Sequence, residues 1–493
     1  MNPGARLLVR MRDARRGDLR RWGRAALAPP LCLLLIGGLH FSLPIWGTHE
    51  ANLGELKRPE PGFRPPSRGE RCLVLSPHCD DEVLATGGLV AEARKAGAPV
   101  EVALITNGDG FRLAAERFFK KALVKPADFI ALGQERRRES LAGLAQMGLK
   151  PSQVVFLGYP DRGASLMWLN QWEWNDLYTS PTTKANRNPY LDSFRPGAPY
   201  AGRALLDDLE AVITRFHPTV IFAPHPDDNH GDHWALYCYT LGALYELGLL
   251  ERVKLELYLV HRGDWPVPQG LHPEKPMAPP AALARLDTRW ATLPLSPRLI
   301  ARKERAVRGY RSQIMVMKRF LLSFVRQEEL FGTRPIGRLV EVKPGTIIVD
   351  GETRDWGNIP PAILDPAQDM GMVSLMPEAD LVQVYVVREG ERLLVRLELQ
   401  GNASAELEYQ VDLHPLVGGK VAGPRRYSFR GGAGPLATEF RAAGRSIEIS
   451  LPWPKAAAGE GVMISAACRF HNYLMDKAAW TLLLPEPKRR EVD

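Results

Sequence analysis

The strongest constraint on the fold is the alternation of short apolar runs with longer helical segments between residues 72 and 260. The runs have the length of buried strands, and short strands alternating with helices are typical of parallel sheets. The expected strands are Cys72–Leu75, Val100–Thr106, Val154–Leu157, Thr219–Ala223 and Leu255–Val260; the expected helices are Glu82–Ala96, Phe129–Met147, Arg203–Phe216 and His233–Leu247. The pattern therefore predicts an α/β fold, a Rossmann-like, mostly parallel sheet with helices on both faces.

The C-terminal third of the chain follows a different period. A proline-rich stretch (265–298) leads into an expected long helical segment, Arg298–Leu330, and from about residue 345 apolar residues recur at every second position. Alternation of this kind, with glycine-rich turns between the runs, is typical of an all-β sandwich. We therefore expect one α/β domain over residues 71–335 and a separate β-sandwich over residues 345–493.

The N-terminus combines a basic tail with an apolar segment. Residues 1–24 contain eight arginines and two aspartates, which accounts for most of the net charge of +8. Ala25–Trp46 contains no charged side chain and, at 1.5 Å per residue, can span a bilayer core of about 30 Å. We expect a transmembrane helix at 25–46, a linker at 47–70, and a single-pass membrane protein. The positive-inside rule predicts a cytoplasmic N-terminus and extracytoplasmic domains. A cleaved signal peptide and a buried helix of a cytosolic protein are the alternative interpretations of the apolar segment.

Composition excludes several classes of protein. The five cysteines are widely separated and form no CxxC pair, which excludes a disulfide scaffold and a thiolate zinc finger. Because the positive charge is concentrated in the N-terminal tail, it does not indicate a nucleic-acid-binding surface, and we expect no nucleic-acid partner.

Two clusters of polar side chains carry the chemistry. The first, Ser76–Glu82, follows the first expected strand, and the second, Pro224–His233, follows the fourth. Ligands bind beyond the carboxyl ends of the strands in open α/β sheets, so the fold brings the two clusters together. Imidazole and carboxylate groups are the usual ligands of a catalytic divalent ion, which predicts a metal site.

These clusters resemble the motifs of the LmbE/PIG-L-like zinc-dependent de-N-acetylases. Pro77–Glu82 matches the family's P-H-x-D-D-E motif, with Cys79 at the variable position, and His230–His233 matches H-x-D-H. Further segments between residues 70 and 335 are also similar. The resemblance implies removal of N-acetyl groups from N-acetylglucosamine-type glycoconjugates or polysaccharides, with Zn²⁺ as cofactor and Fe²⁺ as an alternative.

The resemblance also assigns roles to individual positions. It implies that the metal ligands are His78, Asp81 and His233, and that Asp80 is the general base. His230 would stabilise the oxyanion, protonate the leaving amine, or both, with Asp232 orienting its imidazole. Arg136 would bind substrate or brace the site through Glu139; a solvated helix pair is the alternative for this residue.

Aromatic residues between the two motifs are candidates for sugar contact. The loop 168–178 contains Trp172 and Tyr178, whose rings could stack on a sugar, although three tryptophans in seven residues also fit a local core. In the C-terminal region, residues 346–356 are similar to CBM9-like carbohydrate-binding sandwiches. A domain that packs against the enzyme, or spaces it from the membrane, is the alternative.

These observations favour a membrane-anchored, metal-dependent amino-sugar deacetylase. Two other hypotheses remain: a non-catalytic glycan-binding surface protein, and a deacylase of a lipid or secondary-metabolite amide. The presence of Asp80 beside all three expected ligands favours an enzyme, because a retired site has no need of a base.

Overall fold

The computed structural model describes residues 60–263, 265–367, 376–431, 434–435, 438–457 and 459–486. The chain divides into two units, Met1–Glu55 and Leu56–Asp493, and all the described residues belong to the second, compact unit. Within them, no helix is long and apolar enough to cross a membrane. The expected transmembrane segment, 25–46, lies outside the described residues, as does the basic tail.

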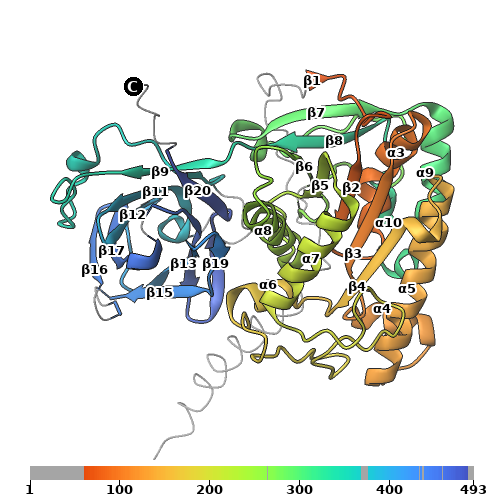
Figure 1. The fold of residues 1–493 in the computed structure, drawn as a ribbon, viewed down its shortest axis with the longest axis horizontal. Coiled ribbons are helices and arrows are strands. Elements are labelled where there is room, and N and C mark those ends of the chain that lie inside the picture. The colour runs from red at the N-terminus through yellow and green to blue at the C-terminus, as the bar shows by residue number, and fades with distance from the viewer. Residues whose placement is uncertain are drawn as a thin grey trace, which may run out of the picture. The chain divides into compact units, whose positions relative to one another are not determined.

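The first domain is built on an eight-stranded sheet in the order β1-β7-β8-β6-β5-β2-β3-β4 (Figure 1). Five neighbouring strands, β6, β5, β2, β3 and β4, run parallel, whereas β8 is antiparallel to both β6 and β7. The strands are β1 (Glu60–Pro61), β2 (Cys72–Ser76), β3 (Val100–Thr106), β4 (Val154–Tyr159), β5 (Val220–Pro224), β6 (Lys254–Tyr258), β7 (Arg289–Pro294) and β8 (Glu328–Thr333). The predicted mostly parallel α/β sheet is confirmed.

Helices cover both faces of this sheet (Figure 1). They are α3 (Asp81–Lys95), α4 (Arg112–Phe119), α5 (Pro126–Gln146), α6 (Ala164–Leu169), α7 (Gly202–Phe216), α8 (Gly231–Glu246), α9 (Pro297–Gly309) and α10 (Arg311–Leu322). Alternate residues of β2 enter opposite cores: Cys72 and Val74 pack with α3, α5 and α9, whereas Leu73 and Leu75 pack with α6, α7 and α8. Burial on both faces explains why this strand is a continuous apolar run.

The strand order places a topological switch at the centre of the sheet. From β2 the chain moves to β3 and β4 on one side, and it later returns to β5 and β6 on the other side of β2. The connections that leave the carboxyl ends of β2 and β5 therefore diverge and leave room for a ligand between them. Both polar clusters follow these two strand ends.

The second domain is the predicted β-sandwich. Its strands are β9 (Gly337–Glu341), β10 (Ile363–Leu364), β11 (Leu381–Glu389), β12 (Arg392–Leu399), β13 (Leu407–Val417), β14 (Lys420–Val421), β15 (Arg425–Arg430), β16 (Glu439–Ala443), β17 (Ser446–Pro452), β18 (Val462–Phe470), β19 (Tyr473–Lys477) and β20 (Thr481–Pro485). Strand β9 pairs with both β11 and β20 and so joins the two halves. Leu393, Val395, Leu397 and Leu399 alternate into one core, as the period of two predicts.

The two domains share a hydrophobic core. Sandwich residues Leu416, Val421, Met463, Trp480 and Leu482 belong to the same buried cluster as α6, α7 and α8. The buried His414 on β13 lies 3.0 Å from the carbonyl oxygen of Trp168 through Nε2 and 2.8 Å from that of Ala422 through Nδ1. The sandwich is therefore packed onto the α/β domain.

Three expected boundaries differ from the structure. Strand β1 pairs with β7 and Phe63 packs on the core, so the sheet begins inside the expected linker 47–70. The sandwich begins with β9 at Gly337 instead of residue 345. The expected long helix 298–330 is instead two helices followed by strand β8. The helices are separated at Tyr310, because this residue has a non-helical backbone (φ −77°, ψ 67°) and its buried ring packs into the core.

Candidate metal centre and active site

The candidate site lies at the carboxyl ends of the parallel strands. His78 follows β2, Asp161 follows β4, and the loop that begins at His225 follows β5; His261 comes shortly after β6. His78, Asp161, His225, Asp228 and His233 are buried, whereas His230 and His261 are partly exposed. The site therefore draws residues from four strand ends around the switch point.

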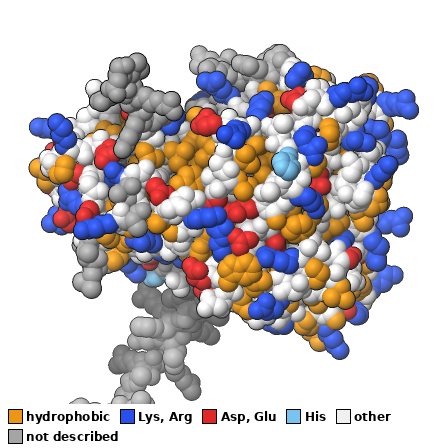
Figure 2. Space-filling model, viewed as in Figure 1, with side chains coloured by type: hydrophobic (Ala, Val, Ile, Leu, Met, Phe, Trp, Pro, Cys, Tyr) orange, Lys and Arg blue, Asp and Glu red, His pale blue; other side chains and the backbone are white. Residues whose placement is uncertain are grey.

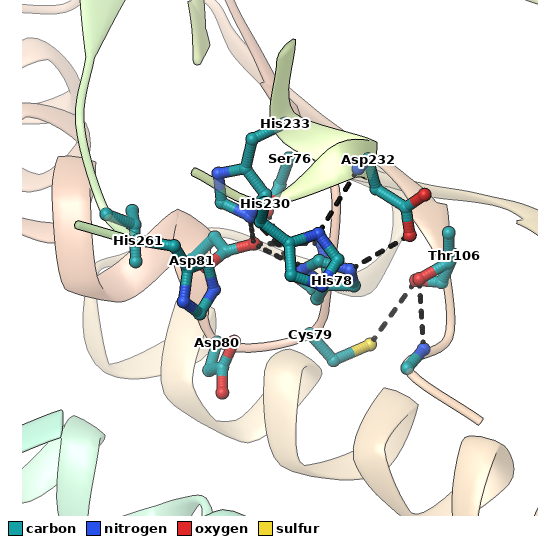
Figure 3. A network of polar contacts seen from close by, with 12 residues as sticks. Ser76, His78, Cys79, Asp80, Asp81, Thr106, His230, Asp232, His233 and His261 are labelled. Atoms are coloured by element: carbon teal, nitrogen blue, oxygen red, sulfur yellow. Dashed lines mark hydrogen bonds and ion pairs between the residues drawn. The ribbon is translucent and has the colours of Figure 1, made fainter. Parts of the chain in front are cut away.

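Three predicted ligands converge on one point (Figure 3). Nδ1 of His78 lies 3.0 Å from Oδ2 of Asp81. Nε2 of His233 lies 3.2 Å from that nitrogen and 3.0 Å from the same carboxylate oxygen. Tetrahedral ligands placed about 2.0–2.2 Å from a zinc ion are roughly 3.3 Å apart, so this triangle of donor atoms fits a divalent ion.

The electrostatics of the triangle also favour a cation. Oδ1 of Asp81 is buried and accepts no hydrogen bond in the structure, and a buried carboxylate is stable only beside positive charge. Burial lowers the pKa of His233, but the carboxylates of Asp228 and Asp81 outweigh burial and raise it to about 9. The donor set of two imidazoles and one carboxylate matches that of an open catalytic zinc site.

Other carboxylates hold the two imidazoles in place. Oδ2 of Asp228 lies 3.1 Å from Nδ1 of His233 and also accepts the backbone N–H groups of Val260 and His261. Nε2 of His78 lies 3.2 Å from Oδ2 of Asp232 and 3.4 Å from Oδ1 of Asp161. Each imidazole therefore presents one nitrogen to the centre and is oriented through the other, as is usual for metal-ligating histidines.

His261 joins the group although the sequence did not indicate it. Its Nε2 lies 3.7 Å from Oδ1 of Asp81, and its ring stacks on Phe320 of α10. His78, Asp81, His233 and His261 form one group that could hold an ion, and His78, Asp161 and His230 form a second, overlapping group. Only the first contains all three predicted ligands.

Asp80 occupies an unusual backbone conformation beside the ligand Asp81. Its φ of 141° lies in a region that residues with a side chain rarely adopt, and such conformations cost about 1–3 kcal/mol. Oε2 of Glu82 accepts the Asp80 backbone N–H at 2.8 Å, and the Tyr310 hydroxyl donates to Oε1 of Glu82 at 2.7 Å. This network holds the strained turn and fixes the Asp80 side chain.

The carboxyl group of Asp80 is nearly inaccessible to bulk water. Burial raises its pKa to about 8, against the opposing effect of Arg136, whose Nη2 lies 3.4 Å from Oδ2. A raised pKa makes this carboxylate a stronger base than an exposed one. The role of Asp80 as general base stays a prediction.

The predicted partnership of His230 and Asp232 takes a different form. The Asp232 carboxylate accepts the backbone N–H groups of Arg162 and Ala164 and contacts His78, so it orients the ligand His78 instead of His230. The Asp232 carboxylate therefore does not take the predicted role of orienting the His230 imidazole, which contacts the Asp232 backbone instead. Nδ1 of His230 accepts the Asp232 backbone N–H at 3.2 Å, which leaves Nε2–H as the donor of a neutral imidazole. Burial and the neighbouring His78 lower the pKa of His230 to about 4.

Two of the three predicted substrate contacts are buried. Arg136 is 4% exposed and donates to the carbonyl oxygens of Gly108 and Cys79, so it braces the Asp80 turn, and its contact with substrate stays a prediction. Glu139 does not pair with it but accepts two hydrogen bonds from Ser312.

The tryptophan loop falls in the core. Trp172 is 4% exposed and packs against Tyr239 and His414, so neither face of its ring is open to a sugar. Tyr178, in contrast, is only partly buried; burial and the carboxylates of Asp232 and Asp161 raise its pKa to about 12, which places it near the site.

The CBM9-like segment shows the same burial. Trp356 is 1% exposed, and its Nε1 donates to Glu448 at 2.6 Å. Its ring therefore stabilises the sandwich and offers no platform for sugar, and glycan binding by this domain stays a prediction.

Three residues of the site were absent from the predicted set, namely the buried Asp161 and Asp228 and the partly exposed His261. In the sequence, Asp161 and Asp228 could have been recognised as site candidates by their position just after expected strands. That position does not distinguish Asp228 from the neighbouring Asp227. His261 carried no motif.

The described residues thus place a candidate metal site of two histidines and one carboxylate at the switch point of the sheet. Residues 73–244 match the family model described as PIG-L: GlcNAc-PI de-N-acetylase. These residues are a PIG-L (LmbE-like) de-N-acetylase domain, which confirms the family assigned from the motifs.

Curated relatives share this domain. A 1D-myo-inositol 2-acetamido-2-deoxy-alpha-D-glucopyranoside deacetylase of Mycobacterium sp. (strain KMS) is 29% identical over 201 residues, which cover 40% of this chain and 53% of that protein. The protein of the same name from Mycobacterium avium (strain 104) is 30% identical over 165 residues, covering 33% and 47%. The chain thus spans about half the length of the curated relatives it matches.

Among solved structures, the N,N'-diacetylchitobiose deacetylase of Pyrococcus horikoshii is 18% identical, covering 53% of this chain and 82% of that one with a TM-score of 0.33. At that TM-score nothing about this chain follows from the likeness.

Proposed function

We propose that this protein is a metal-dependent hydrolase that removes the N-acetyl group from an N-acetylglucosamine-type glycoconjugate, releasing acetate and a free amine. The observation that carries the proposal is the convergence of His78, Asp81 and His233 within 3.0–3.2 Å of one another beside the buried Asp80. The PIG-L domain and the deacetylase names of the curated relatives support the same reaction.

His78, Asp81 and His233 would hold the ion, zinc by the donor set, with iron(II) as the alternative. When bound, such an ion supplies Lewis-acid polarisation of the amide carbonyl and acidifies water. The remaining steps belong to the side chains. Asp80 takes a proton from the attacking water, and its depth in the site keeps bulk water from competing for that proton.

His230 would act mainly as a hydrogen-bond donor. Its Nδ1 accepts a backbone hydrogen bond, so the neutral ring presents Nε2–H, which is suited to the negative charge that develops on the carbonyl oxygen. The proton that Asp80 has gained is then available to the leaving amine. In this proposal His230 stabilises the oxyanion and Asp80 protonates the leaving amine, whereas the sequence left both roles open for His230.

The surroundings of the domain are proposed from the sequence. An N-terminal helix at 25–46 would anchor the chain as a single-pass membrane protein, with the basic tail cytoplasmic and the catalytic domain outside. The substrate would then be a surface polysaccharide, a cell-wall glycan or a lipid-linked sugar. A reporter fused after residue 493 should be active only outside the cytoplasm; activity only inside would contradict this orientation.

The test of the reaction is amine release from a panel of N-acetylglucosamine oligosaccharides and lipid-linked N-acetylglucosamine. We expect release by the metal-loaded protein, loss after chelation, and recovery when zinc is returned. The control is thermal unfolding, which shows whether the chelated protein remains folded. No release from any substrate despite stoichiometric bound metal would contradict the proposal and favour a glycan-binding protein.

A further inference from the structure

One surface beside the site is strongly basic. It consists of the exposed Lys and Arg side chains of residues 112–125 and 311–319, here called the basic patch: Arg112, Arg117, Lys120, Lys121, Lys125, Arg311, Lys318 and Arg319. The same two segments contain one acidic residue, Glu116, which lies 3.8 Å from Arg112, and Asp128 of α5 forms an ion pair with Lys121. Further Lys and Arg side chains line the right-hand edge of Figure 2, where Figure 1 places α5 and α9.

Apolar side chains project from the same patch. Leu123 is 77% exposed, Met315 47% and Leu113 44%. Each is the sequence neighbour of a residue that packs into one small core formed by α4, α5 and α10, namely Val124, Val316 and Ala114. Because these neighbours are packed inward, the three apolar side chains point outward. They lie in the same two segments as the Lys and Arg side chains of the basic patch.

The basic patch lies next to the catalytic residues. The loop that leads into α4 donates the Gly110 backbone N–H to Oδ2 of Asp161 at 2.9 Å, and α4 begins two residues later. On the other side, Phe320 of α10 stacks on His261 with ring centroids 5.4 Å apart. The loop before α4 and the helix α10 therefore both contact the site.

We infer that the basic patch docks the enzyme onto an anionic membrane surface, so that the site opens close to the headgroups. Lys and Arg near such a surface each contribute to attraction, and exposed leucine and methionine side chains gain from entering the headgroup region. A soluble polyanion would use the charges but leave the apolar residues in water, and the exposure of Leu123 therefore favours the membrane. The inference rests on the proposed function, because docking would bring the site to its substrate, an amino sugar linked to lipid.

The experiment measures co-sedimentation of residues 56–493, the compact unit without the apolar segment 25–46, with lipid vesicles. Vesicles of phosphatidylcholine alone are compared with vesicles that also contain phosphatidylglycerol, at low and high salt. The variants are Lys120→Glu/Lys121→Glu and Leu123→Ser. The matched control is Arg425→Glu/Arg430→Glu, which makes the same charge change at exposed positions of the sandwich.

We expect the parent protein to bind the anionic vesicles and to be released by salt. Lys120→Glu/Lys121→Glu should weaken binding at least about ten-fold, because each charge near the surface contributes substantially. Leu123→Ser should weaken it by about three-fold or more, and the control should bind as the parent does. All variants should remain folded, and only Lys120→Glu/Lys121→Glu should unfold at a slightly lower temperature, because Lys121 pairs with Asp128.

Equal weakening by the control pair, or binding unaffected by Lys120→Glu/Lys121→Glu, would overturn the inference. Binding to heparin, a soluble polyanion, is measured in parallel. If Lys120→Glu/Lys121→Glu loses binding to both heparin and vesicles while Leu123→Ser loses neither, the inference is overturned in favour of a soluble polyanion. The outcome is separable from the proposed reaction: binding needs no substrate, and amine release from soluble oligosaccharides should be equal in all variants. Patch-dependent binding by a protein without deacetylase activity would sustain the docking surface and reject the proposed function.

Discussion

Asp228→Asn should weaken metal binding while the three ligands stay in place. Oδ2 of Asp228 lies 3.1 Å from Nδ1 of His233 and accepts the N–H groups of Val260 and His261; Oδ1 accepts the His230 N–H at 3.0 Å. The residue is therefore the only described carboxylate within ion-pair distance of that nitrogen of His233, and it also fixes the loop after β6.

The magnitude follows from these four contacts. An asparagine keeps one carbonyl oxygen, and its less costly orientation leaves that oxygen on the Oδ2 side, which places the amide NH₂ against the His230 N–H. One hydrogen bond is lost, together with the negative charge that orients His233. Loss of such a partner behind a metal-bound imidazole typically costs 10–100-fold in metal affinity, or about 1.4–2.8 kcal/mol.

The assay is competition for zinc with a chromophoric chelator, with Asp227→Asn as the matched control. Asp227 is adjacent in sequence and also buried, but its carboxylate lies 3.5 Å from Arg334 and away from the ligands. We expect Asp228→Asn to lose 10-fold or more in affinity and Asp227→Asn to retain the parent value. Unchanged affinity in Asp228→Asn, or an equal loss in both, would refute the reasoning.

Three further predictions concern stability. Burial, with Arg334 and Arg262 nearby, holds the pKa of His225 well below its ordinary value of 6.5. Below pH 6.5 only the unfolded chain binds a proton at this residue, so the free energy of unfolding falls as the pH falls. Urea titrations between pH 6 and 5 should show that His225→Phe removes about 1.4 kcal/mol per pH unit from this pH dependence. Lys303→Met leaves the buried Glu329, now 2.6 Å from the Lys303 amine, without its cation and should cost about 3 kcal/mol in urea unfolding; a cost below about 1 kcal/mol would contradict a buried pair. Trp172→Ala should cost about 3–5 kcal/mol and the 41% exposed Trp174→Ala less than about 0.5 kcal/mol, and similar costs would contradict the assigned burial.

Much of the α/β domain was predictable because its determinants are local. A strand buried on both faces, such as Cys72–Ser76, must be apolar throughout, and this pattern survives in the sequence. The secondary structure of residues 298–333 was not fully predictable, because the choice between helix and strand there depends on pairing with distant residues. Strand β8 exists through its contacts with β7 and β6, which no local pattern encodes.

The site divides in the same way. His78, Asp81 and His233 stand in compact motifs, and strand order alone brings the motifs together. The exposure of Trp172 was misjudged because exposure is a tertiary property: a tryptophan in a loop looks the same in sequence whether it faces solvent or a neighbouring domain. His261 was missed because it belongs to no motif and reaches the site only through the position of β6.

The most direct test of the central claim compares the parent protein with Asp80→Asn, measuring bound metal and amine release together. The substitution preserves the three ligands and removes only the carboxylate that takes the proton. The account predicts unchanged metal content with a loss of at least about 10²-fold in rate. Equal rates at equal metal content would contradict the assignment of Asp80 as the base, and with it the reaction derived for this site.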